Sequence, residues 1–204
     1  QNKDRVDVIL ANPPFGGGEQ TQVQENFPIK SGETAYLFLQ HFIKKLKARG
    51  RAGIIIKNTF LSNSDGKFLR KELLETCNLH TILNLPQKVF TAGVKTIVLF
   101  FEKGTPTKKI FYYDLNLERN LGLTNPLTEN DLKEFIDLYT SKKEGLNSWS
   151  KNIKDVNKET WDLSVDNPNK KEIIDNRTPT DIISEIEQLN KQGTEALKKI
   201  KELL

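Results

Sequence analysis

The feature that most constrains the fold is an apolar run that stops at two consecutive prolines. Residues 6–11 are apolar except for Asp7 and rich in β-branched side chains, which predicts a buried strand. Pro13 and Pro14 end this strand, because each proline fixes φ near about −65° and removes a backbone N–H. Each also holds the residue before it extended. The sequence therefore predicts a stiff corner at the carboxyl end of a strand, where open α/β sheets bind their ligands.

The side chains of this corner suit the binding of a planar base. The amide oxygen of Asn12 and a neighbouring backbone carbonyl are two acceptors that match the two hydrogens of an exocyclic NH₂ group. Phe15 offers a face on which a base can stack. Such a corner can hold a base taken out of a duplex. The alternative is a strand-ending turn in which Asn12 serves only as a turn residue.

The hydrophobic pattern up to about residue 120 predicts an α/β fold. A strand, a helix and a second strand form a parallel unit with a right-handed crossover. Only about ten residues separate the third and fourth strands, too few for a parallel crossover, so these two should be antiparallel. We expect the second half of a doubly wound, mixed sheet with one antiparallel strand. The predicted elements are a strand at 6–11, a helix from 31 ended by Gly50, a strand at 52–57, a helix at 65–77 that includes Cys77, strands at 79–86 and 95–102, and a short edge strand at 109–114.

The remainder of the chain has a different character. Residues 124–177 predict one helix followed by an irregular polar region with Trp149 and Trp161 as isolated anchors. Residues 178–204 predict a terminal helix that begins at a strong start signal. Its apolar seam is Ile182, Ile186, Leu189, Gly193, Ala196, Ile200 and Leu203. This seam predicts packing against another helix, either in this chain or, as the long polar linker favours, in another subunit.

Further candidates surround the corner. Lys57 and Asn58 follow the second strand and should lie at the same sheet edge as Asn12, either lining the same pocket or forming an ordinary strand exit. Residues 16–30 form a polar loop that either closes over a substrate or is simply a surface loop. No metal site is predicted.

Composition narrows the setting of the protein. The single cysteine, Cys77, excludes an internal disulfide framework and fits a reducing compartment. No segment approaches the length of a membrane span, and no signal peptide is visible. The net charge of +4 permits a polyanionic partner without demanding one. The chain contains no methionine, and its first residues lead directly into a predicted strand. We therefore expect it to be a segment of a longer protein.

Four stretches carry a resemblance to a known family. Residues 7–16, with their Asn-Pro-Pro-Phe, resemble the catalytic motif of methyltransferases that act on adenine N6. Together with residues 35–41, 77–83 and 92–101, they resemble the modification (methylase) subunit of type I restriction–modification systems. The resemblance covers roughly residues 6–120. It implies that residues 1–123 are the C-terminal part of a methyltransferase catalytic domain. The apolar seam and the polar linker before it, and not the resemblance, make residues 178–204 the predicted subunit-contact helix.

The resemblance implies a Rossmann-like sheet, S-adenosylmethionine as cofactor and adenine in double-stranded DNA as substrate. It also implies a DNA-specificity subunit and a restriction subunit as partners, in the cytoplasm. By resemblance, Asn12 and the Pro13 carbonyl accept hydrogen bonds from the target amino group, Phe15 stacks on the base, and Pro14 completes the motif. Gly93, Lys95 and Thr96 lie where the family carries a loop near the flipped base, and are weaker candidates for substrate binding.

The chain departs from the family on the cofactor side. The glycine-rich turn and the acidic residue that hold the cofactor precede the catalytic motif in the family, and nothing here matches them. Gly16–Gly18 opens no helix and is not a nucleotide loop. We expect most cofactor contacts upstream of this chain, with Asn12 as the one candidate contact here. The chain alone should be inactive, and its first strand should expose an unpaired edge.

Two other functions fit the residues. One is an amino-methyltransferase that acts on RNA adenine or on a protein glutamine, since the corner chemistry suits these amino groups equally well. The other is a non-catalytic docking module that keeps a methylase fold and assembles through its terminal helix. The intact Asn12–Phe15 motif argues against the docking module.

Overall fold

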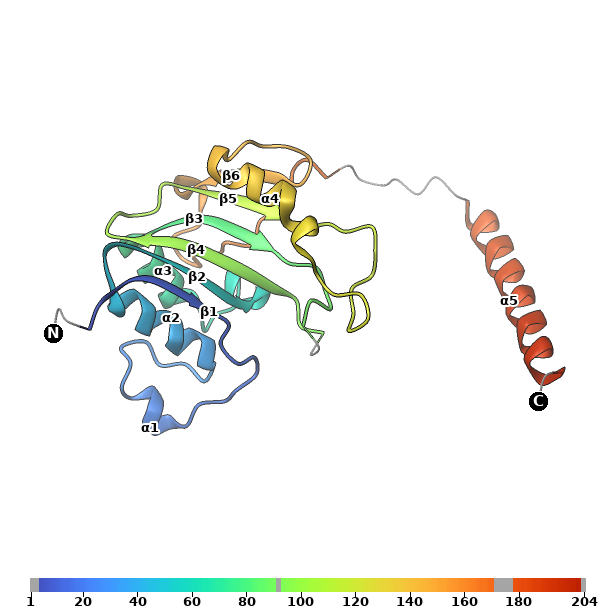
Figure 1. Cartoon of the computed structure of the whole chain (residues 1–204), viewed down its shortest axis with the longest axis horizontal. Helices are drawn as coiled ribbons and strands as arrows, with labels where there is room; N and C mark the ends of the chain where they lie inside the picture. Colours follow the sequence, from blue (N-terminus) through green and yellow to red (C-terminus); the bar gives the residue numbers. More distant parts are fainter. Residues whose placement is uncertain (1–3, 91–92, 171–177, 203–204) are drawn as a thin grey trace. The chain divides into compact units, whose positions relative to one another are not determined.

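A six-stranded mixed sheet with helices on both faces makes up most of the molecule (Figure 1). The computed structural model describes residues 4–90, 93–170 and 178–202. The strand order in space is β1-β2-β4-β3-β5-β6. The strands are β1 (Val6–Ala11), β2 (Leu46–Lys57), β3 (Cys77–Asn84), β4 (Thr96–Lys103), β5 (Lys109–Asp114) and β6 (Ser148–Asn152). The helices are α1 (Thr21–Gln24), α2 (Thr34–Lys45), α3 (Lys67–Thr76), α4 (Glu129–Ser141) and α5 (Pro179–Glu202), with 3₁₀ turns η1 (Asn58–Leu61) and η2 (Ile153–Asp155).

Strand directions confirm the predicted α/β class. Strand β1 runs parallel to β2, and β4 is antiparallel to both β2 and β3. Strand β5 is parallel to β3, but it is not the edge strand that we expected, because β6 pairs with it on the outside. The sheet therefore has a second antiparallel strand, β6. Its sequence, Ser-Trp-Ser-Lys-Asn, is short and polar, and it gives little period-two signal.

Two predicted helix ends were wrong. Helix α2 ends at Lys45 rather than at Gly50, which lies within β2. A Cβ on Gly50 would lie 2.9 Å from the Lys47 carbonyl oxygen and 3.2 Å from that of Asp7, so the backbone around this position favours glycine. Cys77 is the first residue of β3 rather than part of a helix. Its thiol is buried, as expected of a structural cysteine.

The main core lies between the sheet and helices α2 and α3. Alternate strand residues, such as Ile110 and Tyr112, face this side, and Phe111 and Tyr113 face the other. Trp149 and Trp161 both belong to the main core rather than being isolated anchors. The compact unit formed with the sheet extends to Lys170, so the region predicted for 124–177 packs on the sheet as far as it is described.

Arg70 fastens the C-terminal part of this unit to the core. Arg70 is 1% exposed, and in the described part of the chain its guanidinium donates to backbone carbonyls and to the Asn63 amide oxygen. Nε donates to the Trp161 carbonyl at 2.7 Å, and Nη2 to that of Thr160 at 3.0 Å. Nη1 donates to the Phe60 carbonyl at 2.6 Å and to that of Asn63 at 2.9 Å. Burial lowers the pKa of Arg70 below its ordinary value, so these carbonyls replace the hydration that the charge loses.

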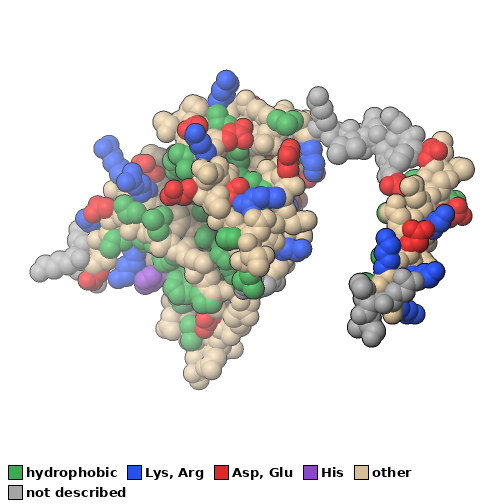
Figure 2. Space-filling view, turned by 45° about the vertical axis from the view of Figure 1, so that its right-hand side comes forward, with side chains coloured by type: hydrophobic (Ala, Val, Ile, Leu, Met, Phe, Trp, Pro, Cys, Tyr) green, Lys and Arg blue, Asp and Glu red, His purple; other side chains and the backbone are tan. Residues whose placement is uncertain are grey.

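The second face is covered only in part. Helix α4 packs on a smaller cluster: Leu83, Leu85, Phe111, Tyr113, Leu115 and Phe135. Beyond α4, a groove of about 680 Å³ opens toward β1. There Leu10 is 78% exposed, and Figure 2 shows hydrophobic side chains at the surface of this unit. Within the described residues β1 pairs with β2 alone, which confirms the expected exposed edge.

Helix α5 belongs to a second unit, residues 171–204. Its start is capped reciprocally: the Thr178 N–H donates to Asp181 Oδ2 at 2.8 Å, and the Asp181 N–H donates to Thr178 Oγ1 at 3.2 Å. The apolar residues of the predicted seam that are described, among them Ile186, Leu189 and Ile200, are exposed along the helix. Leu203 of that seam lies outside the described residues.

The surroundings of His80 predict that the stability of the fold depends on pH. Its ring lies edge-on to Tyr139 at 5.8 Å, and Nδ1 is 2.9 Å from Thr81 Oγ1. Burial, together with the nearby Lys142 ammonium, lowers the pKa of His80 to about 4.

Acidification from pH 6.5 towards pH 4 should therefore destabilise the fold, because the unfolded chain binds a proton at His80 that the folded chain does not. Urea unfolding at pH 7 and pH 5 should show a smaller loss of stability for His80→Gln than for wild type. His41→Gln, at an exposed site on α2, should keep the wild-type loss. Equal losses in wild type and His80→Gln would contradict this role.

Candidate active site

The strand register brings the predicted site residues to one edge of the sheet. Ala11 at the end of β1 pairs with Ile54 of the parallel β2. Lys57 at the end of β2 pairs with Thr96 at the start of the antiparallel β4. As predicted, Lys57 thus lies at the same edge as Asn12. Thr96 and the carboxyl ends of β3 and β5 lie there too.

The corner itself presents the Asn12 amide to solvent. Asn12 and Pro14 are exposed, Pro13 is buried, and Phe15 is half-buried. No side chain or backbone group in the described part of the chain hydrogen-bonds to the Asn12 amide. Gly16 then turns the chain with a φ of +81°. The corner therefore combines a fixed backbone with an amide group whose hydrogen-bonding capacity is available to a ligand.

Phe90 supports the Phe15 ring. The two ring centroids are 5.2 Å apart and the planes meet at 61°, an edge-to-face contact. Phe90 lies in the loop between β3 and β4 and packs against the cluster under α4. Sequence reasoning missed Phe90, although an aromatic residue in a polar loop at this edge was a signal. Phe15 is the residue expected to stack on a base, and this contact connects its ring to the packed side chains of the sheet.

For the methyl transfer that the resemblance implies, replacing Phe90 with Ala should lower kcat/KM by about tenfold, because Phe15 loses the contact that fixes its ring. Phe90→Tyr keeps the edge-to-face contact and should retain wild-type kcat/KM. Phe68→Ala, at an exposed position on α3, is the matched control and should have no effect. Equal activity of Phe90→Ala and Phe68→Ala would argue against the positioning role.

Lys57 and Asn58 tie neighbouring elements together at this edge. Lys57 Nζ forms an ion pair with Glu33 Oε1 at 2.8 Å, next to the start of α2. The Asn58 N–H donates to the Lys95 carbonyl at 2.9 Å. The Lys57 charge is thus matched by a carboxylate, and the Asn58 backbone holds the segment that leads into β4.

The candidates at 93–96 differ in what they present. Gly93 is exposed with a φ of +64°, and Lys95 is exposed. Thr96 is fully buried, and its Oγ1 has no hydrogen-bond partner among the described residues. Of the three, Gly93 and Lys95 are accessible to a ligand and Thr96 is not.

The polar loop 16–30 is anchored at both ends. Thr34 Oγ1 donates to the Gly17 carbonyl at 3.2 Å, and it lies 2.9 Å from Glu19 Oε1. At the far end, the buried Gln40 amide donates to the Ile29 carbonyl at 2.7 Å and accepts from the Ile29 N–H at 3.1 Å. Helix α1 lies between the two anchors.

Of the three glycines, Gly17 is required by a contact within the protein itself. A Cβ on Gly17 would lie 2.6 Å from Thr34 Oγ1, so the glycine is required by the approach of α2. Gly16 and Gly18 have no atoms within 4 Å of such a Cβ. No glycine-rich turn that leads directly into a helix of several turns follows a strand in the described segments. These residues do not fit a cradle for the nucleoside of a cofactor.

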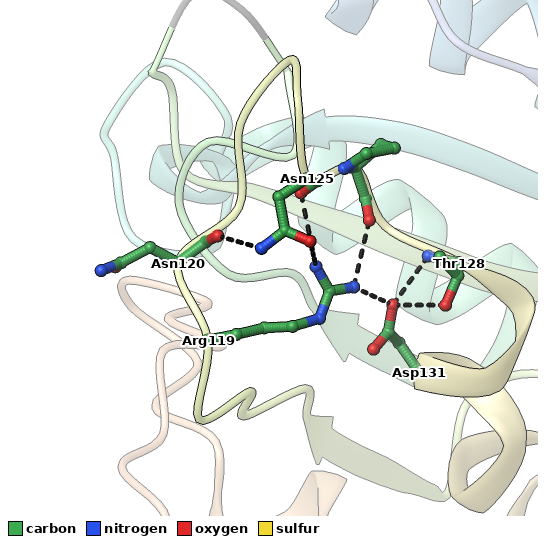
Figure 3. A network of polar contacts seen from close by, with 6 residues as sticks. Arg119, Asn120, Asn125, Thr128 and Asp131 are labelled. Carbon is green, nitrogen blue, oxygen red and sulfur yellow. Dashed lines mark hydrogen bonds and ion pairs between the residues drawn. The ribbon is translucent and has the colours of Figure 1, made fainter.

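The loop that leaves this edge after β5 is fixed by Arg119 (Figure 3). Its guanidinium donates to the Asn125 side chain, to the Pro126 carbonyl at 3.0 Å and to Asp131 Oδ2. Asp131 Oδ2 also accepts from the Thr128 N–H at 2.7 Å, which caps α4. Hydrogen bonds from Thr128 and Arg119 hold the pKa of Asp131 below its usual value. The sequence predicted a helix in this region, and the Arg119 contacts are new.

Within residues 4–90, 93–170 and 178–202, no three His, Cys, Asp or Glu side chains gather as ligands of a metal ion. In the same residues, no helix is both long enough and apolar enough to cross a membrane.

Known proteins share this sequence and this sheet. The N-6 DNA Methylase family model matches residues 1–177. The methylase subunit of the type I restriction enzyme EcoEI from Escherichia coli is 33% identical over 216 residues, covering 98% of this chain and 44% of that subunit.

Two solved structures superpose on the chain. A modification subunit assigned to a type I restriction enzyme of Vibrio vulnificus YJ016 gives a TM-score of 0.78 at 32% identity, covering 86% of this chain and 41% of that one. A chain from a study of complex assembly and conformational transition in the type I R-M system gives 0.74 at 33% identity, covering 98% and 45%. The chain spans less than half the length of each of these relatives.

Proposed function

The chain belongs to the N-6 DNA methylase family. We propose that it is part of a type I modification subunit, which methylates adenine N6 in double-stranded DNA, and that this part holds the target adenine. The observation that supports this most directly is the exposed Asn12 amide at the carboxyl edge of the sheet, beside the braced ring of Phe15. The relatives that carry matching sequence are methylase subunits of type I restriction enzymes.

The residues of this chain act on the amino group of the base. The lone pair of an adenine amino group is delocalised into the ring, so the group is a poor nucleophile. The Asn12 side-chain oxygen and the Pro13 carbonyl accept its two N–H hydrogens, which favours a lone pair directed out of the ring plane. Phe15 stacks on the extruded base and fixes its plane. The chemistry is orientation and electrostatic preorganisation, and no covalent intermediate with the protein is needed.

S-adenosylmethionine, when bound, supplies the methyl group. The described residues do not fit a cofactor cradle, so we place most of its contacts in polypeptide outside this chain, with Asn12 as the one contact proposed here. The uncovered β1 edge and the groove beside Leu10 support this division, since an apolar sheet edge of this kind needs a partner. The chain alone should therefore be inactive.

We propose that α5 is a subunit-contact helix, with the DNA-specificity and restriction subunits of the same system as partners. Its exposed apolar residues repeat at spacings of three and four, which suits packing against another helix. The modification subunit carries out the methyl transfer, and the specificity subunit selects the DNA sequence. A DNA substrate and a single reduced cysteine both fit a cytoplasmic location.

Methyl transfer by the complete protein, assembled with its specificity subunit, tests the proposal. Duplex DNA, single-stranded RNA and a glutamine-containing peptide are each offered with labelled S-adenosylmethionine, and the products are identified by mass spectrometry. We expect N6-methyladenine in DNA alone. Methylation of RNA or of the glutamine amide would point to the alternative amino-methyltransferases, and no transfer to any of the three would favour a docking module.

A further inference from the structure

A second cavity opens at the other end of the sheet strands, away from Asn12. It has a volume of about 430 Å³ and lies at the amino ends of β3 and β5, beside β6 and the end of α4. Its polar lining includes Asn78, His80, Lys108, Lys109, Lys142 and Ser150. Three of these side chains are lysines, and no carboxylate lines the cavity in the part of the chain that the structure describes.

We infer that this cavity binds a phosphate group. Lys108, Lys109 and Lys142 approach it from two different elements, the start of β5 and the end of α4. The Ser150 hydroxyl is buried at its wall and has no hydrogen-bond partner among the described residues. After a rotation of the Ser150 side chain towards the cavity, a phosphate oxygen would satisfy this hydroxyl, and the charge of the phosphate would match the surrounding ammonium groups.

The geometry of Lys142 is the strongest support. It caps α4 in the left-handed region, with φ 51° and ψ 32°, where glycine or asparagine is the usual residue. Its Nζ lies 2.5 Å from Thr81 Oγ1 and 3.9 Å from the centre of the Tyr139 ring. The backbone thus accepts a strained conformation while the ammonium is held in one place at the cavity wall.

The charges around the cavity are incompletely neutralised. Lys109 Nζ has Glu144 Oε1 at 3.3 Å, but both side chains are about half exposed. Lys142 has no carboxylate partner among the described residues, and burial lowers its pKa to about 8. His80, with a pKa of about 4, adds no positive charge at neutral pH. A bound phosphate would supply the missing negative charge and raise the pKa of Lys142.

A purely structural role for Lys142 predicts a different behaviour. In that case the cation–π contact with Tyr139 and the hydrogen bond to Thr81 account for the residue, and anions should not change its titration. The two explanations are therefore separated by the response of the Lys142 ammonium to phosphate.

The first experiment titrates the 204-residue chain with pyrophosphate at fixed ionic strength, with sodium chloride as the reference salt. We expect saturable binding by calorimetry and a rise in the Lys142 pKa, followed by NMR of labelled lysine side chains. Lys108→Gln should weaken binding about tenfold and Ser150→Ala about threefold. Lys143→Gln, an exposed neighbour outside the cavity lining, is the control and should bind as wild type.

A second arm identifies the source of the phosphate. If the cavity takes a phosphodiester of duplex DNA, Lys108→Gln should weaken duplex binding by the chain and reduce the salt slope by about one, with Lys143→Gln unchanged. If it takes a free phosphate compound, pyrophosphate should bind while the two variants bind duplex equally. The inference is overturned if pyrophosphate leaves the Lys142 pKa unchanged and Lys108→Gln binds both pyrophosphate and duplex DNA as wild type does. Neither arm depends on methyl transfer, so these results are independent of the proposed function.

Discussion

Replacing Asn12 with Ala in the complete methylase is expected to lower kcat for methyl transfer by about 10²- to 10³-fold. The reason is that one of the two acceptors for the amino hydrogens disappears, while the corner made by Pro13 and Pro14 stays in place. Because the Asn12 amide is exposed and makes no hydrogen bond with described residues, the change should not affect stability. Single-turnover kinetics with labelled cofactor measure the effect directly.

The control for this variant is Asn152→Ala, an exposed asparagine at the end of β6 and outside the candidate site. It should retain full activity. Binding of duplex DNA, measured by fluorescence anisotropy, should be the same for wild type and both variants, since most contacts that position DNA are made to its phosphates. Activity of Asn12→Ala within a few-fold of wild type would remove Asn12 from the proposed site.

Replacing Arg70 with Met is expected to lower the free energy of unfolding of the chain by about 3 kcal/mol or more. Methionine fills much of the space but leaves the carbonyls of Phe60, Asn63, Thr160 and Trp161 without their donors. Residues 160 and 161 should loosen first, because their carbonyls are the ones in this segment that Arg70 holds. Urea unfolding gives the free energy, and near-ultraviolet circular dichroism reports on Trp161.

Lys71→Met is the matched control, because it places the same side chain on the same helix at a half-exposed position. Its ion pair with Glu75 is at 4.0 Å and exposed, so its loss should cost less than about 0.5 kcal/mol. If both variants lost equal stability, the buried guanidinium of Arg70 would not be the group that holds residues 160 and 161 to the core.

Local patterns predicted the central sheet because its strands are continuous apolar runs with clear ends. Strand β6 escaped prediction because Ser148–Asn152 is polar, and it is a strand only by pairing with β5. The core role of Trp161 escaped for a related reason. It depends on Arg70, which lies 91 residues earlier in the chain, and no local pattern records such a contact.

The candidate site divides in the same way. Its location followed from a proline corner at the end of a strand and from the rule that parallel strands end at one edge. The contacts that brace it did not follow. The pairing of Phe90 with Phe15 and of Lys57 with Glu33 each joins two separate loops or element ends, and loop conformation sets these distances.

The place of β4 in the sheet has a consequence for how the chain folds. Strand β4 lies between β2 and β3, although it follows both in sequence, so the two strands joined by α3 cannot hydrogen-bond to one another. Their facing edges stay unpaired until residues 96–103 arrive, and the pairing then joins positions as distant as Arg51 and Glu102. Such long closures cost chain entropy before any pairing offsets it. The centre of the sheet should therefore form late and in a single cooperative step, with the insertion of β4 as the slow event.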